Sequence, residues 1–267
     1  MTMPEDLVLV RHGESEGNVA TNASKRGDHH YYTPAFRARH SSTWRLTDKG
    51  RAQAAIAGDW IIQNIGEQFH RYYTSEYLRA RETAACLGLP DARWYAEFYL
   101  RERDRGKLDV IDHESLKRDY QDELIRRTID PFYWTPPGGE CLAQVCLRTD
   151  RVLDTLHREC EGSRVILVLH GETMLAIRVR LERMSQYRFR MLDDSKHPHH
   201  RIHNGQVIHY TRVNPETGEV SPYLEWVRSV CPTDLALSSN VWERIQRPSY
   251  TNEQLIENAE RIPRLIV

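Results

Sequence analysis

The chain has 267 residues, with 37 Lys and Arg against 38 Asp and Glu, so its formal net charge is −1. This balance excludes a protein-wide basic field for nucleic acid and a strongly acidic tail, although it leaves room for a local basic pocket. Hydrophobic residues make up 40% of the chain, with 6 Trp and 13 Tyr, which excludes a wholly disordered protein. A chain of this length buries roughly three quarters of its unfolded surface, so its core needs neither disulfides nor a metal ion.

The cysteines and the N-terminus predict a soluble, cytoplasmic protein. The number of cysteines is odd and no CxxC pair is present, which favours reduced thiols. No basic segment followed by an apolar stretch opens the chain, so no signal peptide is expected. No run approaches the ~20 apolar residues of a membrane-spanning helix, so no membrane partner is expected either. The cysteines are Cys86, Cys141, Cys146, Cys160 and Cys231.

Short apolar runs predict the strands of a sheet. The clearest are residues 7–10 and 165–169, which consist of Leu, Val and Ile and are typical of buried central strands in a parallel sheet. Weaker runs predict further strands at residues 69–74, 94–98, 207–210 and 224–227.

Helical segments alternate with these strands. Thr47 is a favourable N-cap for a helix that continues past Trp60. Further helices are predicted at residues 78–87, 142–160 and 174–181, and a short one near 252–261. The alternation predicts an α/β fold, specifically a three-layer α/β/α domain with a mostly parallel central sheet.

The irregular segments set the predicted domain organisation. Residues 19–45 have no clean period and are expected to form a long insert loop, and residues 103–135 a charged, partly helical excursion that could act as a lid. We expect one domain over residues 1–230 and a proline-containing C-terminal extension over residues 231–267.

Both predicted central strands end in a His-Gly pair. Arg11-His12-Gly13 follows the first strand and His170-Gly171 follows the second. Because the carboxyl ends of parallel strands meet at one edge of a sheet, we expect the two histidines to be neighbours. Glycine lets a ligand approach the backbone, and the helix that follows presents its N-terminus to an anion. Together with Arg79, these residues predict a phosphate-sized cationic pocket.

Six segments, taken in order, resemble the motifs of the histidine phosphatase superfamily, which includes the cofactor-dependent phosphoglycerate mutases. They are residues 9–18, 46–54, 74–83, 100–106, 137–140 and 168–171. The resemblance extends over about residues 5 to 212. A single Arg-His-Gly triplet would be a weak signal, but six motifs in the right order make coincidence improbable. The resemblance implies the histidine phosphatase (phosphoglycerate mutase-like) fold and a site without a metal ion or other cofactor.

The same resemblance assigns roles to single residues. His12 is the expected nucleophile, which would form a phosphohistidine while Arg11, Arg79 and His170 hold the phosphoryl oxygens. Glu102 is the candidate acid, which would protonate the leaving oxygen and later accept a proton from water. Further substrate contacts are expected from Ser15, Asn18 and Gly171.

Departures from the mutase pattern favour a phosphatase. Gly17 stands where the mutases typically have Trp, the insert at residues 19–45 is longer, and the sequence after Glu102 differs. We therefore predict a hydrolase that acts on a phosphate monoester of a small metabolite. A phosphomutase with the same pocket is the alternative. A catalytically silent regulatory module that binds a phosphorylated ligand is the alternative from another class, and nucleic-acid binding is a distant third.

Two further clusters could be ligand sites, but we prefer an interpretation without a ligand-binding role or with a minor one. The four histidines at residues 197–203 could bind zinc, but no accompanying ligand pair supports a metal site, so a loop or part of a substrate pocket is favoured. Arg126 and Arg127 could bind a second anionic group of the substrate, but a solvated helix face is the preferred interpretation. The sequence leaves the oligomeric state and the identity of the substrate open.

Overall fold

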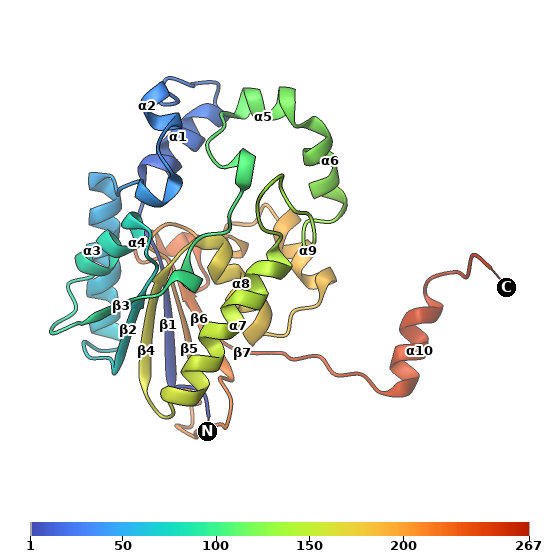
Figure 1. Ribbon diagram of the computed structural model, residues 1–267. Coiled ribbons are helices and arrows are strands. Elements are labelled where there is room, and N and C mark those ends of the chain that lie inside the picture. Colours follow the sequence, from blue (N-terminus) through green and yellow to red (C-terminus); the bar gives the residue numbers. More distant parts are fainter. Residues whose placement is uncertain (1, 267) are drawn as a thin grey trace.

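The computed structural model describes residues 2–266 and contains one seven-stranded sheet with the order β3-β2-β4-β1-β5-β6-β7 (Figure 1). The strands are β1 (Asp6–Arg11), β2 (Arg71–Thr74), β3 (Trp94–Ala96), β4 (Arg164–Leu169), β5 (Val207–Thr211), β6 (Trp226–Val230) and β7 (Trp242–Arg244). The four strands from β3 to β1 are parallel, and β5, β6 and β7 continue the sheet antiparallel. The predicted α/β class and parallel centre are confirmed, with an antiparallel extension on one side.

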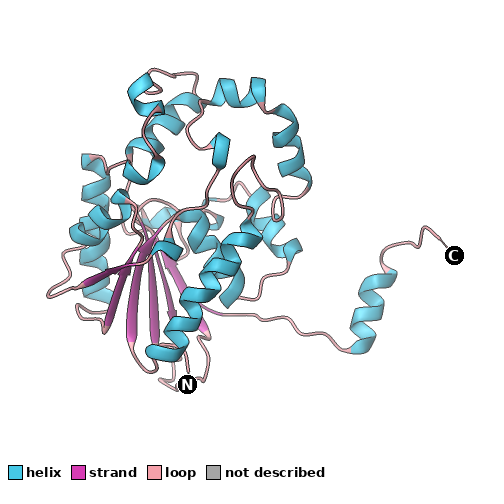
Figure 2. Cartoon of the chain, viewed as in Figure 1, coloured by secondary structure: helices cyan, strands magenta, loops and turns pink. Residues whose placement is uncertain are grey.

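The helices cover both faces of this sheet and extend beyond its carboxyl edge (Figure 2). They are α1 (Glu16–Lys25), α2 (Pro34–Arg37), α3 (Asp48–Asn64), α4 (Leu78–Cys86), α5 (His113–Asp119), α6 (Gln121–Ile129), α7 (Leu142–Glu159), α8 (Gly171–Leu181), α9 (Gln186–Asp194) and α10 (Asn252–Glu260). None of those in residues 2–266 combines the length and apolarity that crossing a membrane requires.

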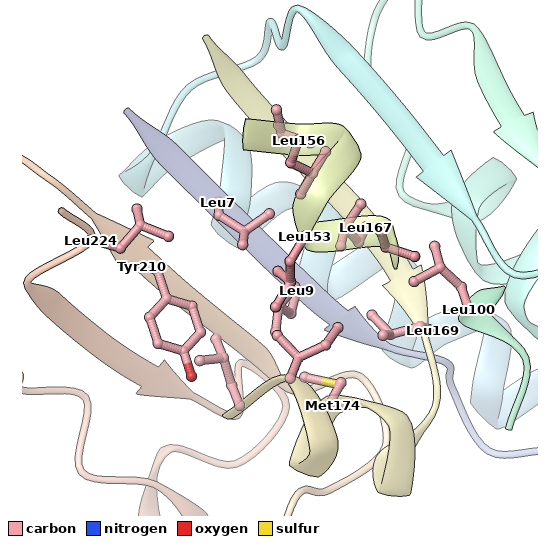
Figure 3. Packing of buried hydrophobic residues seen from close by; sticks show 14 of the residues in the cluster. Leu7, Leu9, Leu100, Leu153, Leu156, Leu167, Leu169, Met174, Tyr210 and Leu224 are labelled. Carbon is pink, nitrogen blue, oxygen red and sulfur yellow. The ribbon is translucent and has the colours of Figure 1, made fainter. Parts of the chain in front are cut away.

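The side chains of β1 alternate between two hydrophobic clusters, one on each face of the sheet, as the period of a strand requires. Leu7 and Leu9 belong to the cluster beneath α7 and α8, which Figure 3 shows with Met174 and Tyr210. Val8 and Val10 belong to the cluster on the opposite face, against α3 and α4. These four of the six side chains of β1 are fully buried, so this strand lies at the centre of the three layers.

The register of β1 and β4 determines where the candidate site lies. Val10 pairs with Val168 and Arg11 pairs with Leu169 in the parallel ladder. The backbone N–H of His12 continues the ladder by donating to the carbonyl oxygen of Leu169 at 2.9 Å. His12 and His170 therefore leave the two central strands side by side at the same edge.

The prediction of a loop over residues 19–45 is wrong for residues 19–25, because α1 continues to Lys25. Ser15 begins α1 with a capping box, in which its side chain and that of Asn18 each bond the other's backbone. The buried face of α1 uses small residues, Ala20 and Ala23, which lack the apolar spacing that marks a larger amphipathic helix.

The insert and the excursion contact one another above the site. The Arg37 guanidinium, at the end of α2, lies 2.7 Å from the Asp112 carboxylate, which caps α5. The backbone N–H of His113 donates to Ser24 Oγ, at 2.7 Å, near the end of α1. We call these two contacts, Arg37–Asp112 and Ser24–His113, the clasp.

The chain after residue 230 contributes an edge strand that the sequence does not predict. β7 pairs antiparallel with β6, and β6 itself begins two residues later and ends three residues later than expected. Arg247 then donates to the carbonyl oxygens of Leu181 and Leu224, at 3.0 and 2.6 Å. Beyond it, every residue from 248 to 266 is exposed, and α10 projects away from the body of the molecule (Figure 1).

Candidate active site

His12 and His170 form the centre of the candidate site. Their ring centroids lie 5.1 Å apart, and the side chains are almost inaccessible to solvent. Gly13 permits this arrangement, because a Cβ there would lie 2.1 Å from the carbonyl oxygen of Gly50 at the start of α3. The first turn after β1 can therefore pass close to α3 only with glycine at residue 13.

The hydrogen bonds of His12 define its tautomer. Nδ1 lies 2.7 Å from the carbonyl oxygen of Gly13, and a carbonyl can only accept, so Nδ1 carries the proton. Nε2 accepts from Nε–H of Arg79 at 3.2 Å, so Nε2 holds the free electron pair of the neutral ring. A neutral imidazole with its lone pair on Nε2 is the form that a nucleophile requires.

The surroundings of His12 keep it neutral. Burial lowers the pKa of His12 well below its ordinary value, and the nearby charges of Arg79 and Arg11 lower it further. The hydrogen bond to Gly13 opposes this effect but is the smallest contribution. Protonation, which would block attack by Nε2, is therefore disfavoured.

Arg79 and Arg11 supply permanent positive charge beside His12. Arg79, which is 5% exposed at the start of α4, donates to His12 and also to the carbonyl oxygen of Ser41 at 2.7 Å. Arg11 donates to the carbonyl oxygen of Ile202, while its buried Nε has no partner among the described residues. A buried donor without an acceptor is costly unless a ligand satisfies it. Arg11 Nε is thus poised to bind an anion.

His170 is the N-cap of α8, and its ring is held by Ser75, the residue after β2. Its Nε2 lies 2.8 Å from Ser75 Oγ, whereas its buried Nδ1 has no partner among residues 2–266. Burial lowers the pKa of His170 well below its ordinary value, and Arg79 and His12 add to the shift. Gly171 leaves room for Arg11 here, because a Cβ at Gly171 would lie 3.3 Å from Arg11 Nε.

The carboxylate of Glu102 is positioned by the N-terminus of α8. It accepts from the backbone N–H of Thr173 at 3.3 Å and from the N–H of Arg103 at 2.9 Å, while the Thr173 hydroxyl donates to the carbonyl oxygen of Arg101 at 2.7 Å. Burial lowers the pKa values of Arg11 and Arg79, and the nearby Glu102 carboxylate raises both of them in part. Glu102 therefore lies beside the cationic pocket, and its role as the acid for the leaving group stays a prediction.

Asn18 and Ser15 differ in what they can offer a ligand. Asn18 Oδ1 accepts from Ser15 and from Nδ2 of Asn204, so the amide nitrogen of Asn18 remains as a donor. Ser15 Oγ is occupied in the cap of α1 and is buried. The substrate contacts expected of Ser15, Asn18 and Gly171 stay predictions, and Ser15 has a clear local task in starting α1.

Sequence reasoning missed three groups that hold the site together. Asn204 donates to the carbonyl oxygen of His12 at 3.0 Å, Ser75 holds His170, and the Ser41 carbonyl holds Arg79. Ser75 lies inside a recognised motif and could have been singled out. Asn204 and Ser41 lie in irregular segments whose positions depend on tertiary packing, so no sequence signal marks them.

The histidine-rich segment forms an exposed 3-10 turn at Pro198–His200, and its Ile202 carbonyl oxygen accepts from Arg11. His199 Nε2 faces the carbonyl oxygen of Ala236 and His203 Nε2 faces that of Pro198. Within residues 2–266, no three His, Cys, Asp or Glu side chains converge in a way that could hold a metal ion.

Comparison with known proteins assigns the family. Residues 7–203 match the histidine phosphatase superfamily (branch 1), and the chain belongs to this family. A 2,3-bisphosphoglycerate-dependent phosphoglycerate mutase of Parvibaculum lavamentivorans is 30% identical over 196 residues, covering 69% of this chain and 83% of the relative. The corresponding mutase of a Methylobacterium species is 32% identical over 183 residues, covering 64% of this chain and 77% of the relative.

Solved structures share the fold at lower identity. A mycobacterial glucosyl-3-phosphoglycerate phosphatase in complex with inorganic phosphate aligns with a TM-score of 0.61 and 20% identity, covering 88% of this chain and 100% of that one. The α-ribazole phosphatase of Shigella flexneri aligns with a TM-score of 0.60 and 19% identity, covering 82% and 96% of the two chains. These similarities establish the histidine phosphatase fold, and the family contains both phosphatases and mutases.

Proposed function

We propose that the protein hydrolyses a phosphate monoester through a phosphohistidine formed on His12. The observation that carries this proposal is the hydrogen bond between His12 Nδ1 and the carbonyl oxygen of Gly13. Because this bond holds the proton on Nδ1, the lone pair of the ring is on Nε2, which faces Arg79. Positive charge from arginine surrounds this nitrogen, which suits an attack on a negatively charged phosphoryl group.

In the first step, His12 Nε2 forms a bond to phosphorus while the bond between phosphorus and the ester oxygen breaks. Arg79 Nε–H, which donates to His12 Nε2 in the free protein, then donates its hydrogen bond to one phosphoryl oxygen. Arg11 Nε–H donates to a second phosphoryl oxygen. Glu102 enters this step in its protonated form, and the leaving oxygen takes that proton and departs as a neutral alcohol.

In the second step, water attacks phosphorus and the bond to Nε2 breaks, which returns the electron pair to His12. The Glu102 carboxylate accepts the proton of the attacking water and is again an acid for the next cycle. The products are inorganic phosphate and the free enzyme.

A phosphomutase is the second candidate, because the curated relatives named above are phosphoglycerate mutases. A mutase uses the same first step but returns the phosphoryl group to a second hydroxyl. It therefore keeps its phosphohistidine long enough to be isolated, whereas a phosphatase passes it to water.

The test measures phosphate release from 4-nitrophenyl phosphate in excess chelator. We expect release by the wild type and none by His12→Ala, because the nucleophile is lost. His157→Ala, which removes an exposed histidine of α7, serves as the control and should match the wild type. A stable phosphoprotein that depends on His12, without phosphate release, would support the mutase. If neither phosphate release nor a phosphoprotein is detected, the protein is a module that binds its ligand without turnover, and the proposal fails.

A further inference from the structure

The ring of Tyr77 lies against two side chains of the candidate pocket. Tyr77 stands directly before α4, and it is half-buried. The guanidinium carbon of Arg79 lies over the face of this ring, 4.9 Å from its centroid. The His170 ring meets the Tyr77 ring edge to face, with the centroids 5.1 Å apart and the planes at 66°. Tyr77 therefore contacts Arg79 and His170 at the same time.

These contacts close a circuit of four side chains around the pocket. His12 lies beside His170, with ring centroids 5.1 Å apart, and its Nε2 accepts from Arg79 Nε–H at 3.2 Å. Tyr77 joins Arg79 and His170 on the other side. Tyr77 brings neither a positive charge nor a nucleophilic nitrogen to this circuit. Any effect of its ring on phosphoryl transfer therefore acts through Arg79 and His170.

The side chain of Tyr77 is not needed to begin α4. Tyr77 occupies the N-cap position, but its side chain makes no capping hydrogen bond within residues 2–266. Its backbone N–H donates to Ser75 Oγ at 3.3 Å, and Ser75 Oγ lies 2.8 Å from His170 Nε2. The backbone thus fixes Tyr77 beside the pocket, while the ring is left to pack against Arg79 and His170.

Arg79 needs a contact that persists during the reaction. In the free protein its guanidinium donates to His12 Nε2 and to the carbonyl oxygen of Ser41. The first of these bonds is lost when Nε2 attacks phosphorus. Ser41 belongs to the insert and begins a short 3-10 turn outside the sheet. Tyr77 directly precedes the helix that carries Arg79, so its contact with the guanidinium does not depend on the position of the insert.

A contact through an aromatic face suits an arginine that must bind phosphate. The ring face attracts the cation without accepting a hydrogen bond from it, so the N–H groups stay free for phosphoryl oxygens. A carboxylate in the same place would occupy these N–H groups and cancel the charge. Burial raises the pKa of the Tyr77 hydroxyl, so this side chain stays neutral and leaves the charge of Arg79 intact.

We propose that Tyr77 is a positioning residue for phosphoryl transfer, whose ring holds the Arg79 guanidinium and the His170 ring in the orientation that binds the phosphoryl group. This inference rests on the proposed function for the reaction, but its effect on phosphate binding can be measured without turnover. The aromatic face carries the effect. Phenylalanine should therefore serve in place of tyrosine, whereas an aliphatic side chain should not.

The kinetic test compares Tyr77→Leu and Tyr77→Phe with the wild type on 4-nitrophenyl phosphate. We expect kcat to fall about tenfold in Tyr77→Leu, because a buried cation–π contact is lost, and by no more than about twofold in Tyr77→Phe. Orthovanadate, which takes up the five-coordinate shape of the reacting phosphoryl group, should inhibit Tyr77→Leu about tenfold less strongly. Tyr95→Leu removes an exposed tyrosine of β3 and is the matched control, which should equal the wild type.

A binding experiment separates this inference from the reaction. Inorganic phosphate is titrated into His12→Ala by calorimetry, so that no turnover is needed. The dissociation constant should rise about tenfold when Tyr77→Leu is added, and no more than about twofold when Tyr77→Phe is added. In His12→Ala/Arg79→Gln, Tyr77→Leu should have a much smaller effect, because the guanidinium on which the ring acts is gone. These results support the inference even if the wild type releases no phosphate.

Several outcomes would overturn the inference. Tyr77→Leu could match the wild type, or Tyr77→Phe could lose as much as Tyr77→Leu, which would assign the effect to the hydroxyl. An equal loss from Tyr77→Leu with and without Arg79 would show a merely structural role. Absence of phosphate binding by His12→Ala would remove the pocket that Tyr77 is proposed to order. Should Tyr77→Leu fail to fold, Tyr77→Met removes the aromatic face with an unbranched side chain, and the same outcomes apply.

Discussion

At the scale of the residue, the site depends on which nitrogen or oxygen of each side chain remains free. His12 uses Nδ1 to bond Gly13, and His170 uses Nε2 to bond Ser75. The free nitrogens are therefore different in the two rings, although both histidines follow parallel strands. His12 presents a lone pair near Arg79, whereas His170 presents Nδ1, which has no partner among the described residues.

Two carboxylates lie near the pocket, and a substitution at each distinguishes their roles. Glu102→Gln keeps the shape and the bond from the Thr173 N–H but removes the proposed proton donor. We expect kcat to fall by about 10²- to 10⁴-fold for an alkyl phosphate, whose leaving oxygen needs a proton, and far less for 4-nitrophenyl phosphate. The measurement is the ratio of the two rates.

Glu172→Gln is the comparison, since Glu172 pairs with Arg103 and Arg105. It should leave the ratio of the two rates near that of the wild type. A ratio that responds to Glu172→Gln but not to Glu102→Gln would move the acid to Glu172.

Much of the residue-level pocket could be predicted, because its main members stand at the ends of apolar runs. Arg11 is the last residue of β1, and His12 and His170 directly follow β1 and β4, so sheet topology alone brings them together. Asn204 could not be predicted in the same way. Its contact with the His12 carbonyl spans 192 residues and depends on how an irregular segment returns to the sheet.

At the scale of the element, the clasp decides how the insert and the excursion lie over the site. Asp112 has two tasks, because its carboxylate accepts from the Ser115 N–H at the start of α5 and also binds Arg37. Burial alone would raise the pKa of Asp112, but these contacts lower it, so the carboxylate is ionised. The ionised form supports both the helix and the clasp.

Two substitutions separate these tasks. Asn caps a helix about as well as Asp, so Asp112→Asn should weaken only the contact with Arg37. Asp112→Ala removes both and should cost about 1 kcal/mol more, the value of a typical N-cap. Hydrogen exchange of the α5 amides should therefore be faster in Asp112→Ala than in Asp112→Asn. Equal exchange in the two variants would show that the cap does not hold α5.

Element prediction succeeded where an apolar period was strong and failed where it was not. The two central strands and α7 were predicted within one residue at each end. The C-terminal half of α1 was missed because its buried side chains are small. β7 was missed because it has three residues, two of them charged, and is held by pairing with β6 rather than by its own hydrophobicity.

At the scale of the whole molecule, three buried histidines link stability to pH. Burial is the largest cause that lowers the pKa of His12, His170 and His209, and for His209 it outweighs the opposing contact with Asp6. The folded protein therefore resists protonation that the unfolded chain accepts near an ordinary histidine pKa of about 6.5.

We expect the free energy of unfolding to fall as the pH decreases from 7.5 to 5.5. The unfolded state binds more protons in this range, so stability rises with pH, by up to about 1.4 kcal/mol per pH unit for each histidine. Urea unfolding at pH 7.5, 6.5 and 5.5 measures the slope. His209→Gln removes one titrating group and should reduce it, whereas a free energy that does not change with pH would contradict the expectation.

The exposed arm after Arg247 has a practical consequence. Within residues 2–266, the last hydrogen bonds between this arm and the body are those that Arg247 donates, and the arm leaves near β7. His12 and His170 lie instead at the carboxyl edge of β1 and β4. The arm is therefore a suitable tether for attaching the protein to a bead or a sensor chip. Immobilised in this way, the molecule would keep its pocket open to the surrounding solution.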